Sequence, residues 1–155
     1  MKILHVGAAN KFYEGYINCD KVTEWKGKKY RLDEVWNLGE PWPHENASID
    51  GIVGMAVFQQ IQWRELVVAF REACRVLKVG GVLRMGVPLL ENGKEIEWNL
   101  GWNNINLFTY ELLERVLSKV GFSRCRMYNP HQGEMEELHR LDNRIDHQFF
   151  IEAVK

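Results

Sequence analysis

The sequence is poor in the features that mark several classes of protein. Its three cysteines, Cys19, Cys74 and Cys125, form no Cys-x-x-Cys pair, so buried free thiols fit better than a disulfide framework or a zinc site. No apolar run approaches the ~20 residues of a membrane-spanning helix, and no basic leader precedes the first strand. We therefore expect a cytoplasmic protein without a membrane segment, a signal peptide or a bound metal.

The sequence also lacks an excess of charge of either sign. Its net charge is −1, which argues against general nucleic-acid binding because that function needs a basic face. A local basic patch remains open in the stretch Lys26-Gly-Lys28-Lys29-Tyr30-Arg31. The chain has 155 residues, of which 46% are hydrophobic, enough for one core, and we expect a single domain over residues 1–155.

Hydrophobic periodicity predicts strands that alternate with helices. The expected strands cover residues 2–6, 16–20, 32–36, 49–55, 82–87, 123–128 and 148–154. A long helix is expected over Trp63–Lys78, ended by Gly80-Gly81, and a second from the N-cap Thr109 to Val120, with Leu112 among its inward-facing residues. A short helix is expected within residues 134–140. This alternation predicts a mostly parallel sheet covered on both faces, with an antiparallel pairing at its end.

The segment KILHVGAANKFYEGYINCD has the layout of a nucleotide-cofactor site. An apolar strand leads into a turn that begins at Gly7, a second strand follows, and Asp20 stands 13 residues after Gly7. In such sites glycines let the backbone approach the ligand, and the acid binds ribose hydroxyls. Here the turn reads Gly7-Ala8-Ala9-Asn10, with one glycine where two or three are usual.

Further segments carry a family resemblance. In order they read SIDGIVGMAVFQQI, REACRVLKVGGVLRMGVP, INLFTYELLERVLSKVGF and LDNRIDHQFFIEAVK. Together with the opening segment they resemble small S-adenosylmethionine-dependent methyltransferases of the type-11 group, over nearly the whole chain. The resemblance implies a three-layer, Rossmann-like methyltransferase fold, S-adenosylmethionine as the cofactor and S-adenosylhomocysteine as the product. It leaves the methyl acceptor open, with a small molecule or a glycan as candidates, and it allows a homo-oligomer or a protein partner.

The resemblance also implies roles for particular residues. Gly7, Ala8 and Ala9 would lie under the methionine part of the cofactor, and Asp20 would accept hydrogen bonds from its ribose. Asn37-Leu38 falls where the family has Asp-Leu near the adenine.

One further position follows from the resemblance, and two tryptophans are candidates because of the long stretch that contains them. Gln59, in Gln59-Gln60, falls where the family has Glu-His, so both ionisable groups are replaced by amides. Trp98 and Trp102, in the long irregular stretch 89–106, are candidates for an acceptor pocket, because long loops in compact domains are usually functional or disordered. No residue stands out as a catalytic base.

These departures leave alternatives open. The changes at Ala8-Ala9, Asn37 and Gln59-Gln60 also fit a catalytically inactive module that kept the fold as a binding or structural partner. A third hypothesis is a nucleotide-binding protein of the same fold with another ligand. We favour the enzyme because each change is small.

Overall fold

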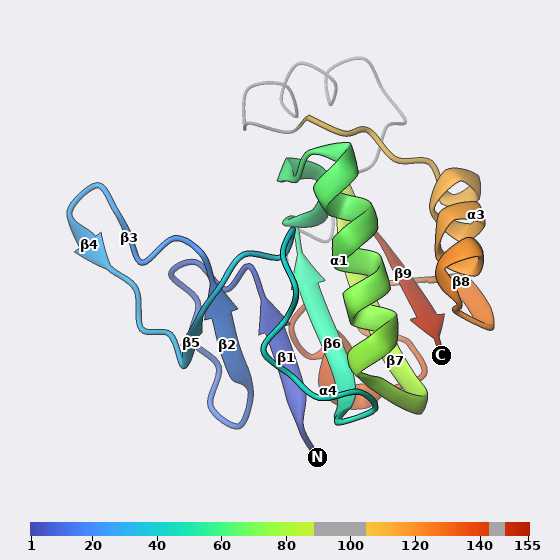
Figure 1. Cartoon of the computed structure of the whole chain (residues 1–155), viewed down its shortest axis with the longest axis horizontal. Coiled ribbons are helices and arrows are strands. Elements are labelled where there is room, and N and C mark those ends of the chain that lie inside the picture. Colours follow the sequence, from blue (N-terminus) through green and yellow to red (C-terminus); the bar gives the residue numbers. More distant parts are fainter. Residues whose placement is uncertain (89–104, 143–147) are drawn as a thin grey trace.

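The computed structural model describes residues 1–88, 105–142 and 148–155 (Figure 1). Its centre is a seven-stranded sheet with the order β5-β2-β1-β6-β7-β9-β8. The strands are β1 Ile3–Val6, β2 Ile17–Asp20, β5 Glu34–Val35, β6 Ile49–Met55, β7 Leu77–Pro88, β8 Arg124–Tyr128 and β9 Gln148–Val154. From β5 to β7 every neighbouring pair is parallel, whereas β9 runs antiparallel to both β7 and β8. The predicted fold class, mostly parallel with an antiparallel last strand, is confirmed.

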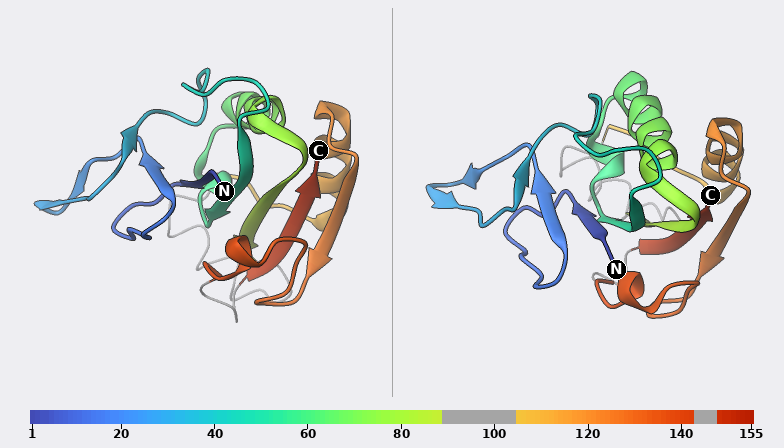
Figure 2. Two further views of the ribbon diagram at one scale, coloured as in Figure 1. Left: turned by 90° about the horizontal axis from the view of Figure 1, so that it is seen from below. Right: turned by 60° about the horizontal axis from the view of Figure 1, so that its bottom comes forward.

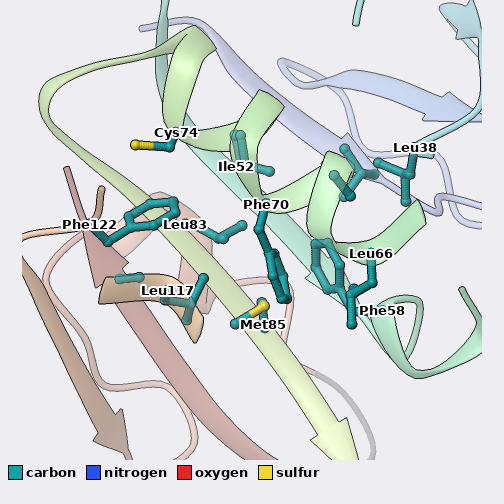
Figure 3. Packing of buried hydrophobic residues seen from close by; sticks show 14 of the residues in the cluster. Leu38, Ile52, Phe58, Leu66, Phe70, Cys74, Leu83, Met85, Leu117 and Phe122 are labelled. Carbon is teal, nitrogen blue, oxygen red and sulfur yellow. The ribbon is translucent and has the colours of Figure 1, made fainter. Parts of the chain in front are cut away.

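Helices cover the two faces of the sheet unequally. Helices α1 (Trp63–Val76) and α3 (Tyr110–Val120) lie on one face, and the short α4 (Glu136–His139) lies on the other (Figure 2). The apolar stripe of α1 places Leu66 and Phe70 against the sheet residues Leu83 and Met85, all fully buried (Figure 3). No helix in the described ranges is long and apolar enough to cross a membrane.

The predicted helix ends are partly right. Thr109 caps α3 by accepting a hydrogen bond from the Leu112 amide through its side chain, and Gly121 ends it at φ 116°. The Leu112 side chain, however, is 38% exposed, so this residue does not face the core as expected. Helix α1 ends at Val76, two residues earlier than predicted, because the next residue turns extended, enters the core and pairs with β6.

A small hairpin was not predicted. Strands β3 (Glu24–Trp25) and β4 (Lys28–Lys29) form a separate two-stranded sheet that projects beyond β5 (Figure 1). Lys26 and Gly27 between them have φ of 48° and 75°, the left-handed pair that a two-residue type I′ turn requires. Each strand has only two residues, too few to show a periodic pattern in the sequence.

Candidate functional site

The candidate residues meet at one edge of the sheet. In a parallel sheet the carboxyl ends of the strands share an edge, and ligands of such folds bind there. Strand β1 lies between β2 and β6, and β2 lies next to β5. The turn after β1, the end of β2 and the segments after β5 and β6 therefore all open onto this edge, which we call the carboxyl edge. It brings together Gly7, Ala8, Ala9 and Asp20 and places Asn37 and Gln59 in the segments that follow the flanking strands β5 and β6.

The turn after β1 keeps the shape of a glycine turn in spite of its alanines. Gly7 has φ 68° and Ala9 has φ 48°, so both adopt the left-handed conformation that favours glycine. The Ala8 amide donates to the Cys19 carbonyl at 3.1 Å, which ties the turn to β2. The alternating positions that would carry glycines in a Gly-x-Gly turn are thus the two with positive φ.

Asp20 holds this turn from the end of β2. Its Oδ2 accepts a hydrogen bond from the Ala9 amide at 2.9 Å, and its Oδ1 accepts one from the Val22 amide at 2.9 Å. A carboxylate offers about four acceptor sites, so these two bonds leave capacity on both oxygens. The carboxylate is only partly buried and can still receive hydroxyl donors from a ligand.

Val57, a residue that sequence reasoning missed, closes the space over Gly7. A Cβ atom on Gly7 would lie 2.5 Å from Val57 Cγ2, well inside van der Waals contact. Glycine at this position is therefore required by packing as well as by its positive φ. Ala56, just before Val57, also has positive φ, at 56°, and its amide donates to the Gly86 carbonyl at 2.9 Å. Two strained alanines thus stand at the ends of neighbouring strands, a type of strain that clusters at functional sites.

The Asn37 side chain makes hydrogen bonds within its own loop. Its Oδ1 accepts a hydrogen bond from the Gly39 amide at 3.2 Å, and its Nδ2 donates to Glu40 Oε1 at 3.3 Å. Leu38 is buried, and its carbonyl accepts a hydrogen bond from the indole of Trp42 at 3.1 Å. These contacts are the ordinary turn chemistry of asparagine, with spare acceptor capacity left on Oδ1.

Gln59 is buried at this edge, and its backbone holds the segment at Ile105 and Asn106. It lies in the 3-10 turn η1 (Phe58–Gln60), and its carbonyl accepts hydrogen bonds from the Ile105 and Asn106 amides at 2.9 and 3.0 Å. Among the described residues, its side-chain Oε1 has no hydrogen-bond partner. Trp98 and Trp102 lie outside the described residues, so their predicted place in an acceptor pocket stays a prediction.

The buried histidine His5 and the buried cysteines do not supply a catalytic base. Burial lowers the pKa of His5, whose Nδ1 lies 3.0 Å from Asn18 Oδ1 within the sheet. The three cysteines are free and buried, as predicted. Burial raises the pKa of Cys125 to about 12 and also raises that of Cys19, so neither is a ready nucleophile. Within residues 1–88, 105–142 and 148–155, no three His, Cys, Asp or Glu side chains are grouped to hold a metal ion.

No family model and no curated protein matches the sequence. Solved structures do match the fold. An S-adenosylmethionine-dependent methyltransferase from Archaeoglobus fulgidus superimposes with a TM-score of 0.75 at 16% identity, covering 99% of this chain and 86% of that one. A complex from Haloferax volcanii, between the Trm112 methyltransferase activator and a protein described as a methyltransferase, gives 0.70 at 14% identity, with 99% and 81% covered.

A third neighbour holds a cofactor. The phosphoethanolamine N-methyltransferase 2 of Haemonchus contortus, in complex with S-adenosyl-L-methionine, gives a TM-score of 0.64 at 16% identity, with 99% of this chain and 48% of that chain covered. At such identities the likeness shows the fold, which is that of S-adenosylmethionine-dependent methyltransferases. Cofactor and activity have to be argued from the residues of the carboxyl edge.

Proposed function

We propose that the protein is a small S-adenosylmethionine-dependent methyltransferase that binds its cofactor at the carboxyl edge. The observation that carries this proposal is the conformation of the first turn. Ala9 keeps a left-handed φ of 48° that costs an alanine about 1–2 kcal/mol, and its amide is held by Asp20. Strain of this kind is found at functional sites, and here it falls on the turn whose amide is bound by the acid at the end of β2.

The residues present fit the adenosyl cofactor. The left-handed φ angles of Gly7 and Ala9 give the turn the conformation in which the backbone of such folds approaches a ligand. Asp20 would accept hydrogen bonds from the ribose hydroxyls through its remaining lone pairs. Asn37, through the free capacity of Oδ1, and Leu38 would flank the adenine. When bound, the cofactor supplies an electrophilic methyl group on a sulfonium sulfur.

The proposed catalytic contribution of the protein is orientation. Holding the donor and the acceptor in line can supply about 7–11 kcal/mol of the barrier without any catalytic side chain. This fits a carboxyl edge at which the described residues offer no general base. We therefore propose an acceptor whose nucleophilic atom needs no deprotonation by the protein, such as an amine or a thiolate on a small molecule or an amine on a glycan, because a hydroxyl acceptor would need a general base. We also propose that the whole chain acts as one domain of the type-11 group and works as a homo-oligomer or with a protein partner.

A second candidate function rests on the flanking residues. The Asn37 carboxamide makes hydrogen bonds within its own turn. Gln59 is buried, and its backbone carbonyl binds the amides of Ile105 and Asn106. Both residues serve the scaffold. This observation favours a module that keeps the fold, with or without cofactor, and performs no methyl transfer.

Thermal unfolding with a panel of ligands separates these functions. S-adenosylhomocysteine at 100 times its Kd should stabilise the protein by about 2.7 kcal/mol, while ATP and NAD at equal concentration should give no shift. A shift with ATP or NAD alone would support the third hypothesis, another nucleotide ligand. Binding of S-adenosylhomocysteine without turnover of S-adenosylmethionine, over a panel of acceptors, would support the inactive module.

A further inference from the structure

The hairpin β3–β4 is a concentration of positive charge that the carboxyl edge does not use. Residues 21–31 contain four lysines, one arginine and a single glutamate, in a chain whose net charge is −1. All of residues 21–29 are exposed, and the hairpin stands away from the sheet (Figure 1). The net charge of the chain is therefore the sum of a strongly basic projection and an acidic remainder.

The base of the hairpin is firmly anchored. At one end, the Val22 amide is bound by the Asp20 carboxylate. At the other, Asp33 Oδ2 accepts hydrogen bonds from the Asn18 amide at 2.8 Å and from its Nδ2 at 2.9 Å. The Arg31 guanidinium lies 3.7 Å from the centre of the Phe12 ring. A two-stranded hairpin is marginal by itself, so these contacts are what hold it in place.

The side chains of the hairpin have one aromatic and cationic face. Trp25 and Lys28 are directly opposed across the two strands, and opposed residues project from the same face of a pair. Trp25 is 59% exposed. Among the described residues, Lys26, Lys28 and Lys29 make no ion pair or side-chain hydrogen bond. A large exposed indole beside unpaired ammonium groups is not explained by the stability of the fold.

We propose that this hairpin binds single-stranded nucleic acid, with an unpaired base stacked on Trp25 and the neighbouring phosphates near Lys26 and Lys28. Stacking on an aromatic ring together with phosphate contacts from basic side chains is how sequence-tolerant single-strand binding works. The inference is independent of the proposed methyl transfer. It concerns one projection and not the acidic remainder of the surface, which agrees with a net charge too low for a general nucleic-acid binder.

Fluorescence anisotropy with a fluorescein-labelled oligothymidine of about 12 nucleotides, within the range of single-strand site sizes, tests the proposal. Trp25→Ala should weaken binding about tenfold, within the range that stacking of one base supplies. With about three phosphates neutralised, affinity should fall about 20-fold between about 50 and 200 mM salt. Lys28→Gln should reduce that salt dependence. Because all these side chains are exposed, the variants should have the same melting temperature as the parent.

Matched controls use exposed residues elsewhere. Trp63→Ala, at the start of α1, and Lys119→Gln, on α3, remove the same side-chain types and should leave the affinity unchanged. A duplex of the same sequence should bind more weakly than the single strand, because its bases are not free to stack. Equal binding by Trp25→Ala and the parent, or tighter binding of the duplex, would overturn the proposal. So would binding only to vesicles of phosphatidylglycerol and phosphatidylcholine, which would assign the hairpin to a membrane surface.

Discussion

The Ala9 amide donates a hydrogen bond of 2.9 Å to Asp20 Oδ2, and this bond joins the first turn to the end of the second strand. It links the two parts of the site that the sequence places 11 residues apart. Asp20 therefore has two tasks in this account, since it shapes the turn from within and offers its remaining lone pairs to a ribose. Changes at these two residues should affect stability and ligand binding in different proportions.

Asp20→Ala should weaken binding of S-adenosylhomocysteine by about 1–3 kcal/mol, because a charged acceptor is lost. It should also lower the free energy of unfolding by roughly 1–3 kcal/mol, since the Ala9 and Val22 amides lose their acceptor. Calorimetry and urea unfolding measure the two effects. Asp20→Asn keeps one oxygen acceptor and should lose less of both. If Asp20→Ala binds as well as the parent, the carboxylate serves only the turn.

Ala9→Gly should raise the free energy of unfolding. The sequence alone suggests a loss, because glycine adds freedom to the unfolded chain, but the left-handed φ of 48° reverses the sign. Relief of about 1–2 kcal/mol of strain exceeds the roughly 0.5–1 kcal/mol of added freedom, for a net gain of roughly 0.5–1 kcal/mol. Ala8→Gly is the matched control, since Ala8 is not among the residues with positive φ, and it should be destabilised. Cofactor affinity should rise in Ala9→Gly if Ala9 limits approach of the ligand.

Arg84→Met should be strongly destabilising. The fully buried Arg84 guanidinium binds two buried carboxylates, Asp142 at 2.6 Å and Glu152 at 2.7 Å. Without the guanidinium these carboxylates lose their cation, which costs roughly 3–5 kcal/mol in such sites. The control is Lys78→Met, which removes a largely exposed pair with Asp50 and should cost less than about 1 kcal/mol. Comparable losses in urea unfolding of the two variants would contradict a buried ionic cluster.

The free energy of unfolding should decrease as the pH drops below the pKa of an ordinary histidine. Burial lowers the pKa of both His5 and His44, so the unfolded chain binds more protons than the folded one once the pH falls through about 6.5. Their contribution is therefore present above that pH and is lost toward the lowered pKa, with a slope of up to about 1.4 kcal/mol per pH unit for each histidine. Urea unfolding at about pH 7.5 and 5.5, either side of the ordinary histidine pKa, should show this loss, and His5→Gln should reduce it. An unchanged slope in His5→Gln would place the proton uptake elsewhere.

Much of the fold could be predicted from the sequence because its signals are local. The stripe of α1, the Thr109 cap and the Gly121 stop each depend on a few neighbouring residues, and the structure confirms the two caps. The projecting hairpin could not be predicted, since its two-residue strands show no periodicity. The early end of α1 depends on the pairing of Leu77 with a distant strand, which no local pattern records.

The placement of the candidate residues at one edge of the sheet was predictable, and their conformation was less so. The sequence pointed to Gly7, Ala9 and Asp20, and the structure brings them together. It could not show that Ala9 keeps a glycine-like φ, because an alanine at that position argues against it. Nor could it show Val57 above Gly7, a contact between segments that are far apart along the chain. Asn37 was a candidate adenine contact, and only the structure shows that its side chain also closes its own loop.

Isothermal titration of the purified protein with S-adenosylhomocysteine is the direct test of a cofactor site at the carboxyl edge. We expect saturable binding with one ligand per chain, weakened in Asp20→Ala and unaffected by Lys119→Gln, a substitution of an exposed residue of α3. Absence of binding at millimolar ligand, in both the parent and Ala9→Gly, would contradict a cofactor site and would leave the first turn as a structural feature of a repurposed fold.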